Sequence, residues 1–286
     1  MTDRRALPPI PLVVLDAVVR GALAEDLSRG DLTTDATVPQ DVLGSPVLRA
    51  RERLVIAGLD VFAKAFALVD PEIQIERRRL DGEVAEAGDV IAEIKGRANP
   101  ILKGERVALN FMQRMSGVAT ATRRFVDALP EDATMRITDT RKTTPGLRAL
   151  ERYAVRCGGG HNHREDLGAA VLIKDNHIAA CGSVTTAIER ARSHAPHTSK
   201  IECEVDTVDQ LHEALEAGAD IVMLDNFDDQ TLADAVAIVA GRAFIEVSGN
   251  VTLERIPVIA QAGVHAISIG GLTHSSRSVD LGLDWS

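Results

Sequence analysis

The alternation of apolar and polar residues changes along the chain and predicts two kinds of domain. Residues 12–25 have helical spacing, and the turn-rich stretch EDLSRGDLTTDATV that follows has little periodicity. Residues 45–96 form short β-like runs separated by glycines, which predicts an antiparallel sheet with one helix, LDVFAKAFALVD, over one face. Residues 101–129 then predict a long helix, in which Ser116–Gly117 is a candidate break.

After Pro130 the chain alternates regularly between short apolar strands and helices. The predicted strands are RITDT, AVLIKDNH, KIECEVD, DIVMLDN, AFIEVSG and AISIGG, and a helix follows each of them except the last. Repeated βα units with continuously apolar strands indicate a parallel sheet that is covered on both faces. A complete (β/α) barrel needs eight strands. The pattern therefore predicts an α/β fold with a truncated (β/α) barrel, preceded by an N-terminal α+β domain.

Composition and charge exclude several classes of function. The chain has 286 residues and a formal net charge of −10, which argues against nucleic acid as the main partner because a phosphate backbone requires a basic surface. Aromatic residues make up only 3% of the sequence, too few for stacking on single strands. No window has the roughly 18 uninterrupted apolar residues of a membrane helix, and MTDRRALPP lacks the apolar region of a secretory signal. Three cysteines without paired spacing are typical of a reducing compartment, so we expect a cytoplasmic protein.

Polar residues gather at the carboxyl ends of the predicted strands. Ligands of barrels and of open parallel sheets bind at this edge, so the residues there describe the walls of a candidate site. They are Arg141, Lys142, Lys174, Asp175, Asn176, Glu202, Glu204, Asp225, Asn226, Ser248, Gly249, Asn250, Gly270 and Gly271, and the loop GGGHNHRED adds His163 and Arg164. Any single charge of this kind is more often a solvated rim residue. Their repetition at successive strand ends indicates a common pocket.

The charges of this pocket divide by sign. Positive charge for a ligand with several anionic groups comes from Arg141, Lys142, His163, Arg164 and Lys174. Each charge-assisted contact contributes about 1.5–3 kcal/mol, and arginine fits a carboxylate with two parallel bonds. Glu204 and Asp225 follow neighbouring strands and suit Mg²⁺, which takes one or two carboxylates together with substrate phosphates.

Other residues of the pocket carry weaker signals. VSGN and IGGL let backbone N–H groups approach a phosphate closely, but glycine turns of this kind are common. We expect Glu202 to be structural. Cys157, His161 and His163 lack the fourth ligand and the spacing of a zinc site. Nevertheless, few functions require a dicarboxylate, a divalent cation and a phosphate in one pocket, so the combination narrows the possible activities.

Several long, nearly unbroken motifs resemble those of one known family. They are EDLSRGDLTT, ERVALNFMQRMSGVATAT, DTRKTTPGLR, GGGHNHR, LIKDNH, ECEVD, MLDNF, EVSGN and GVHAISIGGLTHS, and they span nearly the whole chain. The family is that of the quinolinate phosphoribosyltransferases, which make nicotinate mononucleotide in de novo NAD synthesis. The resemblance implies a truncated α/β barrel with an N-terminal α/β sandwich domain. We assign residues 1–115, rejoined by the tail 277–286, to the sandwich domain and residues 116–276 to the barrel that carries the active site.

The resemblance also implies roles for the site residues. The two carboxylates of quinolinate would meet Arg141, His163, Arg164 and Lys174, with Arg106 reaching across from a partner subunit. Lys142, Glu204 and Asp225 would be the catalytic residues, which handle the pyrophosphate and ribose of phosphoribosyl pyrophosphate, with Glu204 and Asp225 as the ligands of Mg²⁺. The ribose 5′-phosphate would be held by Ser248, Gly249, Asn250, Gly270 and Gly271.

The implied reaction is that of a pentosyltransferase, nicotinate-nucleotide pyrophosphorylase (carboxylating). Phosphoribosyl transfer to quinolinate with decarboxylation gives nicotinate mononucleotide, pyrophosphate and CO₂, and it requires Mg²⁺ but no organic cofactor. The family resemblance implies a homodimer or a hexamer whose sites are shared between subunits. One departure lies beside Arg164, where Glu165 and Asp166 replace the glycine or small apolar residue that is usual in the family.

Three alternatives fit parts of the pattern. A homologue of the same fold that acts on another acid, such as the molybdenum-transport-associated type, would need fewer cations than this pocket offers. A Schiff-base aldolase would use Lys142 or Lys174 as its nucleophile in an apolar setting, whereas TRKTT and IKDNH are polar. A non-catalytic phosphosugar-binding barrel would not need the carboxylate pair of Glu204 and Asp225.

Overall fold

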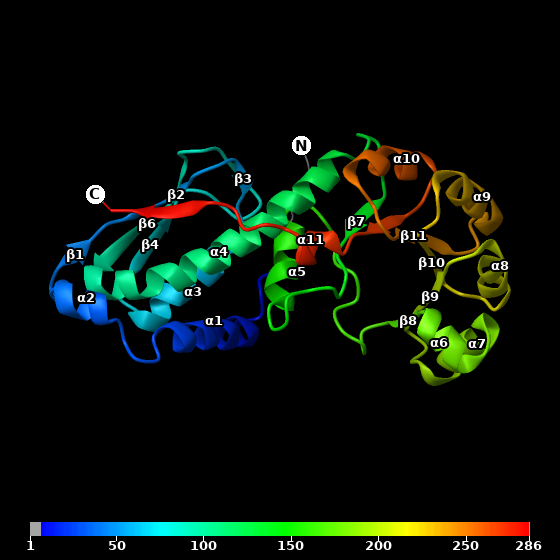
Figure 1. Ribbon diagram of the computed structural model, residues 1–286, viewed down its shortest axis with the longest axis horizontal. Coiled ribbons are helices and arrows are strands. Elements are labelled where there is room, and N and C mark those ends of the chain that lie inside the picture. Colours follow the sequence, from blue (N-terminus) through cyan, green and yellow to red (C-terminus); the bar gives the residue numbers. More distant parts are fainter. Residues whose placement is uncertain (1–6, 286) are drawn as a thin grey trace. The chain divides into compact units, whose positions relative to one another are not determined.

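A computed structural model describes residues 7–285 of the chain (Figure 1). Residues 1–6, part of the stretch in which the sequence predicts no secretory signal, and residue 286 lie outside the described residues. The chain forms two compact units. Unit 1 comprises Met1–Arg123, Thr143–Gly159 and Gly271–Ser286, and unit 2 comprises Arg124–Lys142 and Gly160–Gly270. Within the described range, no helix has the length and apolar character needed to cross a membrane.

Unit 1 is built on an antiparallel sheet, which confirms the predicted sheet type. Its strands are β1 (Leu43–Gly44), β2 (Val47–Ala50), β4 (Gln74–Arg77), β6 (Val90–Arg97) and β13 (Leu281–Asp284). β6 lies at the centre, because it pairs with β1, β2 and β4. β13 pairs with β2, so the C-terminal residues complete this sheet. A separate antiparallel pair joins β3 (Leu54–Val55) to β5 (Val84–Ala85).

The core of unit 1 is mainly aliphatic and includes a pair of phenylalanines on one of its helices. The helices of unit 1 are α1 (Leu12–Asp26), α2 (Leu32–Thr37), α3 (Leu59–Val69), α4 (Ala98–Asp127), α5 (Arg148–Cys157) and α11 (Gly271–His274). On α3, Phe62 and Phe66 are fully buried and meet edge to face, with ring centroids 5.0 Å apart. A Cβ atom at Gly104 of α4 would lie 2.9 Å from the ring of Phe66, so α4 packs closely against α3. Burial of each large apolar side chain contributes about 1.5–3 kcal/mol.

The predicted break in the long helix is wrong, because α4 continues through Ser116 and Gly117. Ser116 is fully buried, and its hydroxyl accepts a hydrogen bond from the backbone N–H of Ala57 at 3.0 Å. Gly117 lies so close to the C-terminal segment that a Cβ atom there would overlap the carbonyl oxygen of Arg277. The two small residues therefore serve close packing within unit 1 and do not end the helix.

Unit 2 is a parallel sheet of six strands, which confirms the predicted truncated barrel. The strands are β7 (Arg136–Thr138), β8 (Val171–Ile173), β9 (Ile201–Val205), β10 (Ile221–Asp225), β11 (Phe244–Ser248) and β12 (Ala266–Ser268). Their order is β7-β12-β11-β10-β9-β8, and every neighbouring pair is parallel. β7 and β8 are the two edges of the sheet, so the barrel remains open between them.

Helices alternate with these strands, as βα repeats require (Figure 1). They are α6 (Asp175–Cys181), α7 (Val184–His194), α8 (Val208–Glu216), α9 (Asp229–Val239), the short 3₁₀ helix η1 (Leu253–Arg255) and α10 (Ile256–Gln261). Ser183, Thr207 and Asp228 each cap the following helix by accepting a backbone N–H from the residue three positions on. Such caps contribute about 1 kcal/mol each and fix where the helix begins after its strand.

Two local predictions were wrong because side-chain caps start helices there. The turn-rich segment after residue 25 contains α2, which begins where the carboxylate of Asp31 accepts the N–H of Thr34 at 2.9 Å. The strand predicted to run to His177 ends at Ile173 instead. His177 Nδ1 accepts the backbone N–H of Lys174 at 2.9 Å, which closes the first turn of α6.

The two units differ from the predicted domains at α5, which the sequence assigns to the barrel (116–276) and the structure to unit 1. The contacts of α5 explain this: the hydroxyl of Tyr153 donates to the carboxylate of Asp81 at 2.8 Å, and Leu150 is buried. The final segment joins unit 1 from Gly271 onward, whereas the predicted sandwich domain combines 1–115 with 277–286.

Two glycines in helices give opposite predictions for the same substitution. Gly21 on α1 has open space around its missing side chain, so Gly21→Ala is expected to raise the free energy of unfolding by about 0.5–1 kcal/mol through reduced backbone entropy of the unfolded chain. Gly117→Ala is expected to lower it by about 1–3 kcal/mol, because the added methyl overlaps the backbone at Arg277. Thermal unfolding of both variants beside the wild type measures the difference, and equal shifts would contradict the packing described for α4.

Candidate active site

The parallel register brings the predicted acidic residues and the serine together at one edge of the sheet in unit 2. Glu204 lies opposite Met223 in the pairing of β9 with β10, and Asp225 lies opposite Ser248 in the pairing of β10 with β11. Residues that are opposite each other, or two apart on one strand, share a face of a sheet. Glu204, Asp225 and Ser248 therefore lie on the same face near the carboxyl ends of three adjacent strands, as the sequence predicts.

Lys174 and Glu204 form an ion pair across the ends of β8 and β9. The ammonium of Lys174 contacts one carboxylate oxygen of Glu204. The side chain of Lys174 is half-exposed, whereas that of Glu204 is largely covered. Either side chain can exchange its partner for a ligand of opposite charge. An anion drawn to Lys174 and a cation drawn to Glu204 would replace the internal pair.

The loop that carries the predicted cationic residues His163 and Arg164 is held by a buried aspartate. The sequence analysis did not single out this aspartate. Asp139, fully buried just after β7, accepts the backbone N–H of His163 at 2.7 Å and the amide N–H of Asn162 at 2.6 Å. Asp139 also donates its own N–H to the carbonyl of His161 at 3.1 Å. These bonds fix the backbone on which His163 and Arg164 stand.

Arg141 and Arg164 lie close enough to repel each other. Burial and the charge of Arg141 together lower the pKa of the Arg164 guanidinium. The guanidinium of Arg164 is also oriented by donation to the carbonyl of Ala170 at 3.0 Å. Two neighbouring guanidiniums favour a ligand with two negative groups, because such a ligand removes their repulsion while it forms charge-assisted bonds.

His163 lies between two buried glutamates. Its Nε2 is 3.3 Å from Glu202 and 3.4 Å from Glu246, and both glutamates are about 95% buried, at 4% and 5% exposure. Its Nδ1 accepts the backbone N–H of Arg164 at 2.7 Å. Nδ1 therefore carries no proton, and the proton of the ring is on Nε2, directed at the carboxyl groups.

This cluster keeps a shared proton at neutral pH. Burial alone lowers the pKa of His163, but hydrogen bonds with Glu202 and Glu246 outweigh it and raise the pKa to about 10. Burial, together with the charge of Glu246, raises the pKa of Glu202. In a coupled set the proton belongs to the group as a whole.

His163, Glu202 and Glu246 also have converging ligand atoms, within 4.8 Å of one another, as a metal site would. The contact at Nδ1 argues against that assignment. A histidine that binds metal through one nitrogen carries a proton on the other and donates it, whereas here Nδ1 is an acceptor. We therefore interpret the cluster as a device that fixes the orientation of His163.

A second group of acids fits a divalent cation better. Burial, followed by the charges of Asp225 and Asp175, raises the pKa of Asp206, which comes directly after β9. The carboxylates at this edge thus repel one another, and a bound cation would relieve that repulsion. Of these groups, Glu204 and Asp225 combine partial burial with positions on adjacent strands, so the residues present fit Mg²⁺ with oxygen ligands.

The segment predicted to hold a phosphate makes a tight turn after β11. Gly249 has a φ of 88°, and a Cβ atom there would overlap the side-chain oxygen of Asn226. Glycine is therefore required at this position. Beside the turn lies a hollow of about 330 Å³, lined by Asn226, Phe227, Asp228, Asp229, Gly249, Asn250 and Arg255. Gly270 follows β12, and Gly271 begins α11 in unit 1.

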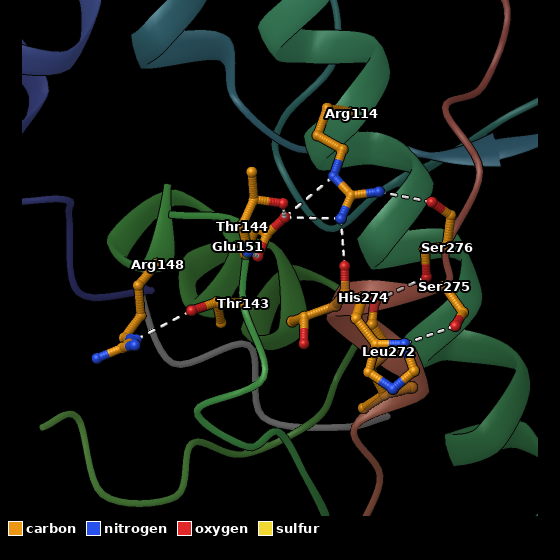
Figure 2. A network of polar contacts seen from close by, with 10 residues as sticks. Arg114, Thr143, Thr144, Arg148, Glu151, Leu272, His274, Ser275 and Ser276 are labelled. Atoms are coloured by element: carbon orange, nitrogen blue, oxygen red, sulfur yellow. Dashed lines mark hydrogen bonds and ion pairs between the residues drawn. The ribbon is translucent and has the colours of Figure 1, made fainter. Parts of the chain in front are cut away.

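Within unit 1, a buried ion pair holds two backbone segments, each of which is next in sequence to predicted site residues (Figure 2). Arg114 donates to the carboxylate of Glu151 at 2.7 and 3.0 Å, and Glu151 is fully buried. Glu151 accepts the N–H of Thr144 at 3.0 Å, two residues after Lys142. Arg114 also donates to the carbonyls of Thr273 and Ser276, just after Gly271.

The remaining predicted residues are exposed. Lys142 lies on the segment after β7, where its N–H donates to the hydroxyl of Thr140 at 3.1 Å. Arg106 lies on the surface of α4 in unit 1. Asp139 and Glu246 are the residues of the candidate site that the sequence analysis did not single out. Glu246 had a detectable signal, because it is a charged residue in the middle of an apolar strand.

The glutamate cluster predicts a pH dependence of stability. The proton that His163 shares with Glu202 and Glu246 has a pKa of about 10 in the folded chain, against about 6.5 for histidine in the unfolded chain, so this stabilisation is complete below pH 6.5 and is lost as the pH rises toward 10. The loss is on the order of 2–4 kcal/mol. Glu246→Gln should weaken the fall of the thermal midpoint over this range, while the exposed control Glu189→Gln should follow the wild type. An unchanged pH profile for Glu246→Gln would contradict the cluster.

Comparisons with known proteins agree with the fold and identify the family. Residues 118–284 match the family model of the quinolinate phosphoribosyl transferase C-terminal domain, and residues 31–116 match that of its N-terminal domain. A probable nicotinate-nucleotide pyrophosphorylase (carboxylating) of Bacillus subtilis is 44% identical over 91% of this chain and 89% of its own length. The corresponding Mycobacterium leprae enzyme is 42% identical over 93% of this chain and 95% of its own length. The crystal structure of NadC from Streptococcus pyogenes superimposes with a TM-score of 0.92 at 41% identity, covering 98% of this chain and 99% of that one. The chain belongs to the quinolinate phosphoribosyltransferase family.

Proposed function

We propose that this protein transfers a phosphoribosyl group from phosphoribosyl pyrophosphate to quinolinate and releases CO₂, forming nicotinate mononucleotide and pyrophosphate in NAD synthesis. The observation that carries the proposal is the gathering of Arg141, Arg164 and Lys174 with Glu204 and Asp225 in unit 2. A site with paired guanidiniums beside paired carboxylates suits an organic dianion next to a metal-bound pyrophosphate. The names of the relatives support the same reaction.

Quinolinate is the partner of the cationic groups in this proposal. Its two adjacent carboxylates would take up the charges of Arg141 and Arg164, whose mutual repulsion favours a dianion. Lys174 would leave Glu204 and bind the substrate. His163 has both ring nitrogens engaged within the protein, so its contribution comes through the cluster that fixes it and the neighbouring Arg164.

Phosphoribosyl pyrophosphate would occupy the acidic edge and the turn after β11. Glu204 and Asp225 would hold Mg²⁺, which supplies Lewis-acid stabilisation of the pyrophosphate when bound. Lys142 would place a fixed positive charge beside the leaving group. Backbone N–H groups of Ser248, Gly249, Asn250, Gly270 and Gly271 would hold the 5′-phosphate.

The chain's own groups then act by position and charge. As the bond between the anomeric carbon and pyrophosphate breaks, the ribose becomes oxocarbenium-like and the quinolinate nitrogen attacks it. Orientation of the two substrates can supply about 7–11 kcal/mol of the barrier. The pyridinium that forms withdraws electrons from the adjacent ring carbon, so the carboxylate there leaves as CO₂. The electron pair of the broken bond stays on that ring carbon, which then takes up a proton from water. No covalent intermediate with the enzyme is needed.

We further propose that the protein assembles as a homodimer or hexamer and works in the cytoplasm. Arg106 is exposed on α4, where it is available to a neighbouring subunit and would complete that subunit's quinolinate site. The three cysteines, Cys157, Cys181 and Cys203, are free thiols, in keeping with a reducing compartment.

Removal of the charge at Lys142 tests the proposal. With quinolinate, phosphoribosyl pyrophosphate and Mg²⁺, wild-type protein should form nicotinate mononucleotide, and Lys142→Ala should lower kcat about 100–1000-fold, the usual effect of removing one group that stabilises transition-state charge. Lys200→Ala removes a similarly exposed lysine elsewhere in unit 2 and should leave the rate unchanged. Turnover of nicotinate in place of quinolinate would favour a homologue that uses another acid, and no turnover of either would overturn the proposal.

Mixed assemblies test the shared site. Arg106→Ala and Lys174→Ala subunits are each expected to be nearly inactive on their own, because each lacks one charge of the quinolinate site. If Arg106 serves a neighbour, mixed assemblies contain some sites with both native residues, and part of the activity should return after the two variants are dissociated and reassembled together. Absence of any recovery, with mixed assembly verified by mass, would refute the sharing of sites.

A further inference from the structure

Asn226 follows Asp225 at the end of β10 in an unusual backbone conformation. Its φ is 57°, in the left-handed region that residues other than glycine seldom adopt, although asparagine tolerates it better than most. The backbone N–H of Asn226 donates to the carbonyl of Ser248 at 3.1 Å. The chain therefore turns sharply at this point while it remains bonded to the end of β11.

The side chain of Asn226 connects two parts of the candidate site. Its amide N–H donates to the carboxylate of Asp225 at 2.7 Å, and its oxygen accepts from the amide of Asn250 at 3.2 Å. One asparagine thus contacts both the carboxylate assigned to Mg²⁺ and the turn assigned to the 5′-phosphate. The N–H donor of the side chain faces the carboxylate, and its oxygen acceptor faces the turn.

The opposing turn is shaped around this side chain. Gly249 has no Cβ atom that could collide with the oxygen of Asn226, and Asn250 is also in the left-handed region, with a φ of 46°. The choice of residue at three positions, glycine at 249 and asparagine at 226 and 250, is thus explained by one set of contacts. Backbone strain that surrounding structure maintains is typical of functional sites.

We propose that Asn226 is a positioning residue that couples the two ends of the phosphoribosyl pyrophosphate site. By holding the carboxylate of Asp225 and the Ser248–Asn250 turn in one arrangement, it makes occupation of the pyrophosphate end favour occupation of the phosphate end. This inference rests on the proposed function, because it takes the ligand of each end from that proposal. It assigns a role to a residue that need not touch the substrate.

The coupling is measurable with the two halves of the substrate. Ribose 5-phosphate is titrated into the protein by calorimetry, with and without saturating Mg²⁺ and pyrophosphate. In the wild type, the second ligand pair should change the affinity for ribose 5-phosphate by about 5-fold or more, the lower range of allosteric coupling. In Asn226→Gly each ligand should still bind, but the ratio of the two affinities should fall to within about 2-fold of unity.

The glycine variant separates the side chain from the backbone. Asn226→Gly removes both side-chain hydrogen bonds but accepts the positive φ without strain. Ala240, at a φ of 47° after α9 and outside the site, provides the matched control: Ala240→Gly makes the same kind of backbone change and should keep the wild-type coupling. Asn250→Gly removes the partner in the turn, accepts the positive φ of that residue without strain and should weaken the coupling as well, which gives a second variant should Asn226→Gly fold poorly.

The outcomes distinguish this inference from the proposed function. Undiminished coupling in both Asn226→Gly and Asn250→Gly would overturn the inference alone, as would a wild type that binds both ligands without coupling. A fall in quinolinate affinity as large as the fall in coupling would show a general structural defect and would also overturn it. A wild type that binds neither phosphoribosyl pyrophosphate nor its two halves would overturn the proposed function itself.

Discussion

The parallel register of the six strands in unit 2 is the constraint on which the candidate site depends. Opposite residues of paired strands share a face, so the register alone determines that Glu204, Asp225 and Ser248 meet at one edge. The strands are only three to five residues long. A slip of one residue in any pair would turn these side chains to the opposite face and bury them beneath the helices. The apolar residues that hold the register therefore also position the chemistry.

The charged side chains of this site would be costly to bury or to hold close together if their partners were absent. Glu202 and Glu246 are buried, and they are tolerated because His163 and a shared proton neutralise part of their charge. Arg141 and Arg164 repel each other in the free protein, and Glu204 is paired with Lys174. Bonds such as those of Asp139 to the loop of His163 keep these groups in place before any ligand arrives. A site prepared in this way avoids reorganisation when charge develops in a transition state.

The sequence predicted the barrel and most of the rim residues because each βα unit repeats the same local pattern. Strand ends can be located from apolar runs, and ligands bind there in every fold of this type. Prediction failed where a side chain makes a specific contact. Ser116 and Gly117 look like a helix break until the packing against Ala57 and Arg277 is known. Asp139 looks like a turn residue, and Asn226 looks like one more polar residue at a strand end, since the contacts of both depend on partners distant in the sequence. The placement of α5 in unit 1 likewise follows from Tyr153 and Asp81, which no periodicity reveals.

The central claim is that the charges at this edge serve a dicarboxylate that loses one carboxylate as the nucleotide forms. Quinolinate with an isotopic carbon label in the carboxyl group next to the ring nitrogen tests it most directly. Incubated with phosphoribosyl pyrophosphate and Mg²⁺, the protein should release labelled CO₂ and unlabelled nicotinate mononucleotide in equal amounts. Label retained in the nucleotide, or nucleotide formed without release of labelled CO₂, would contradict the account.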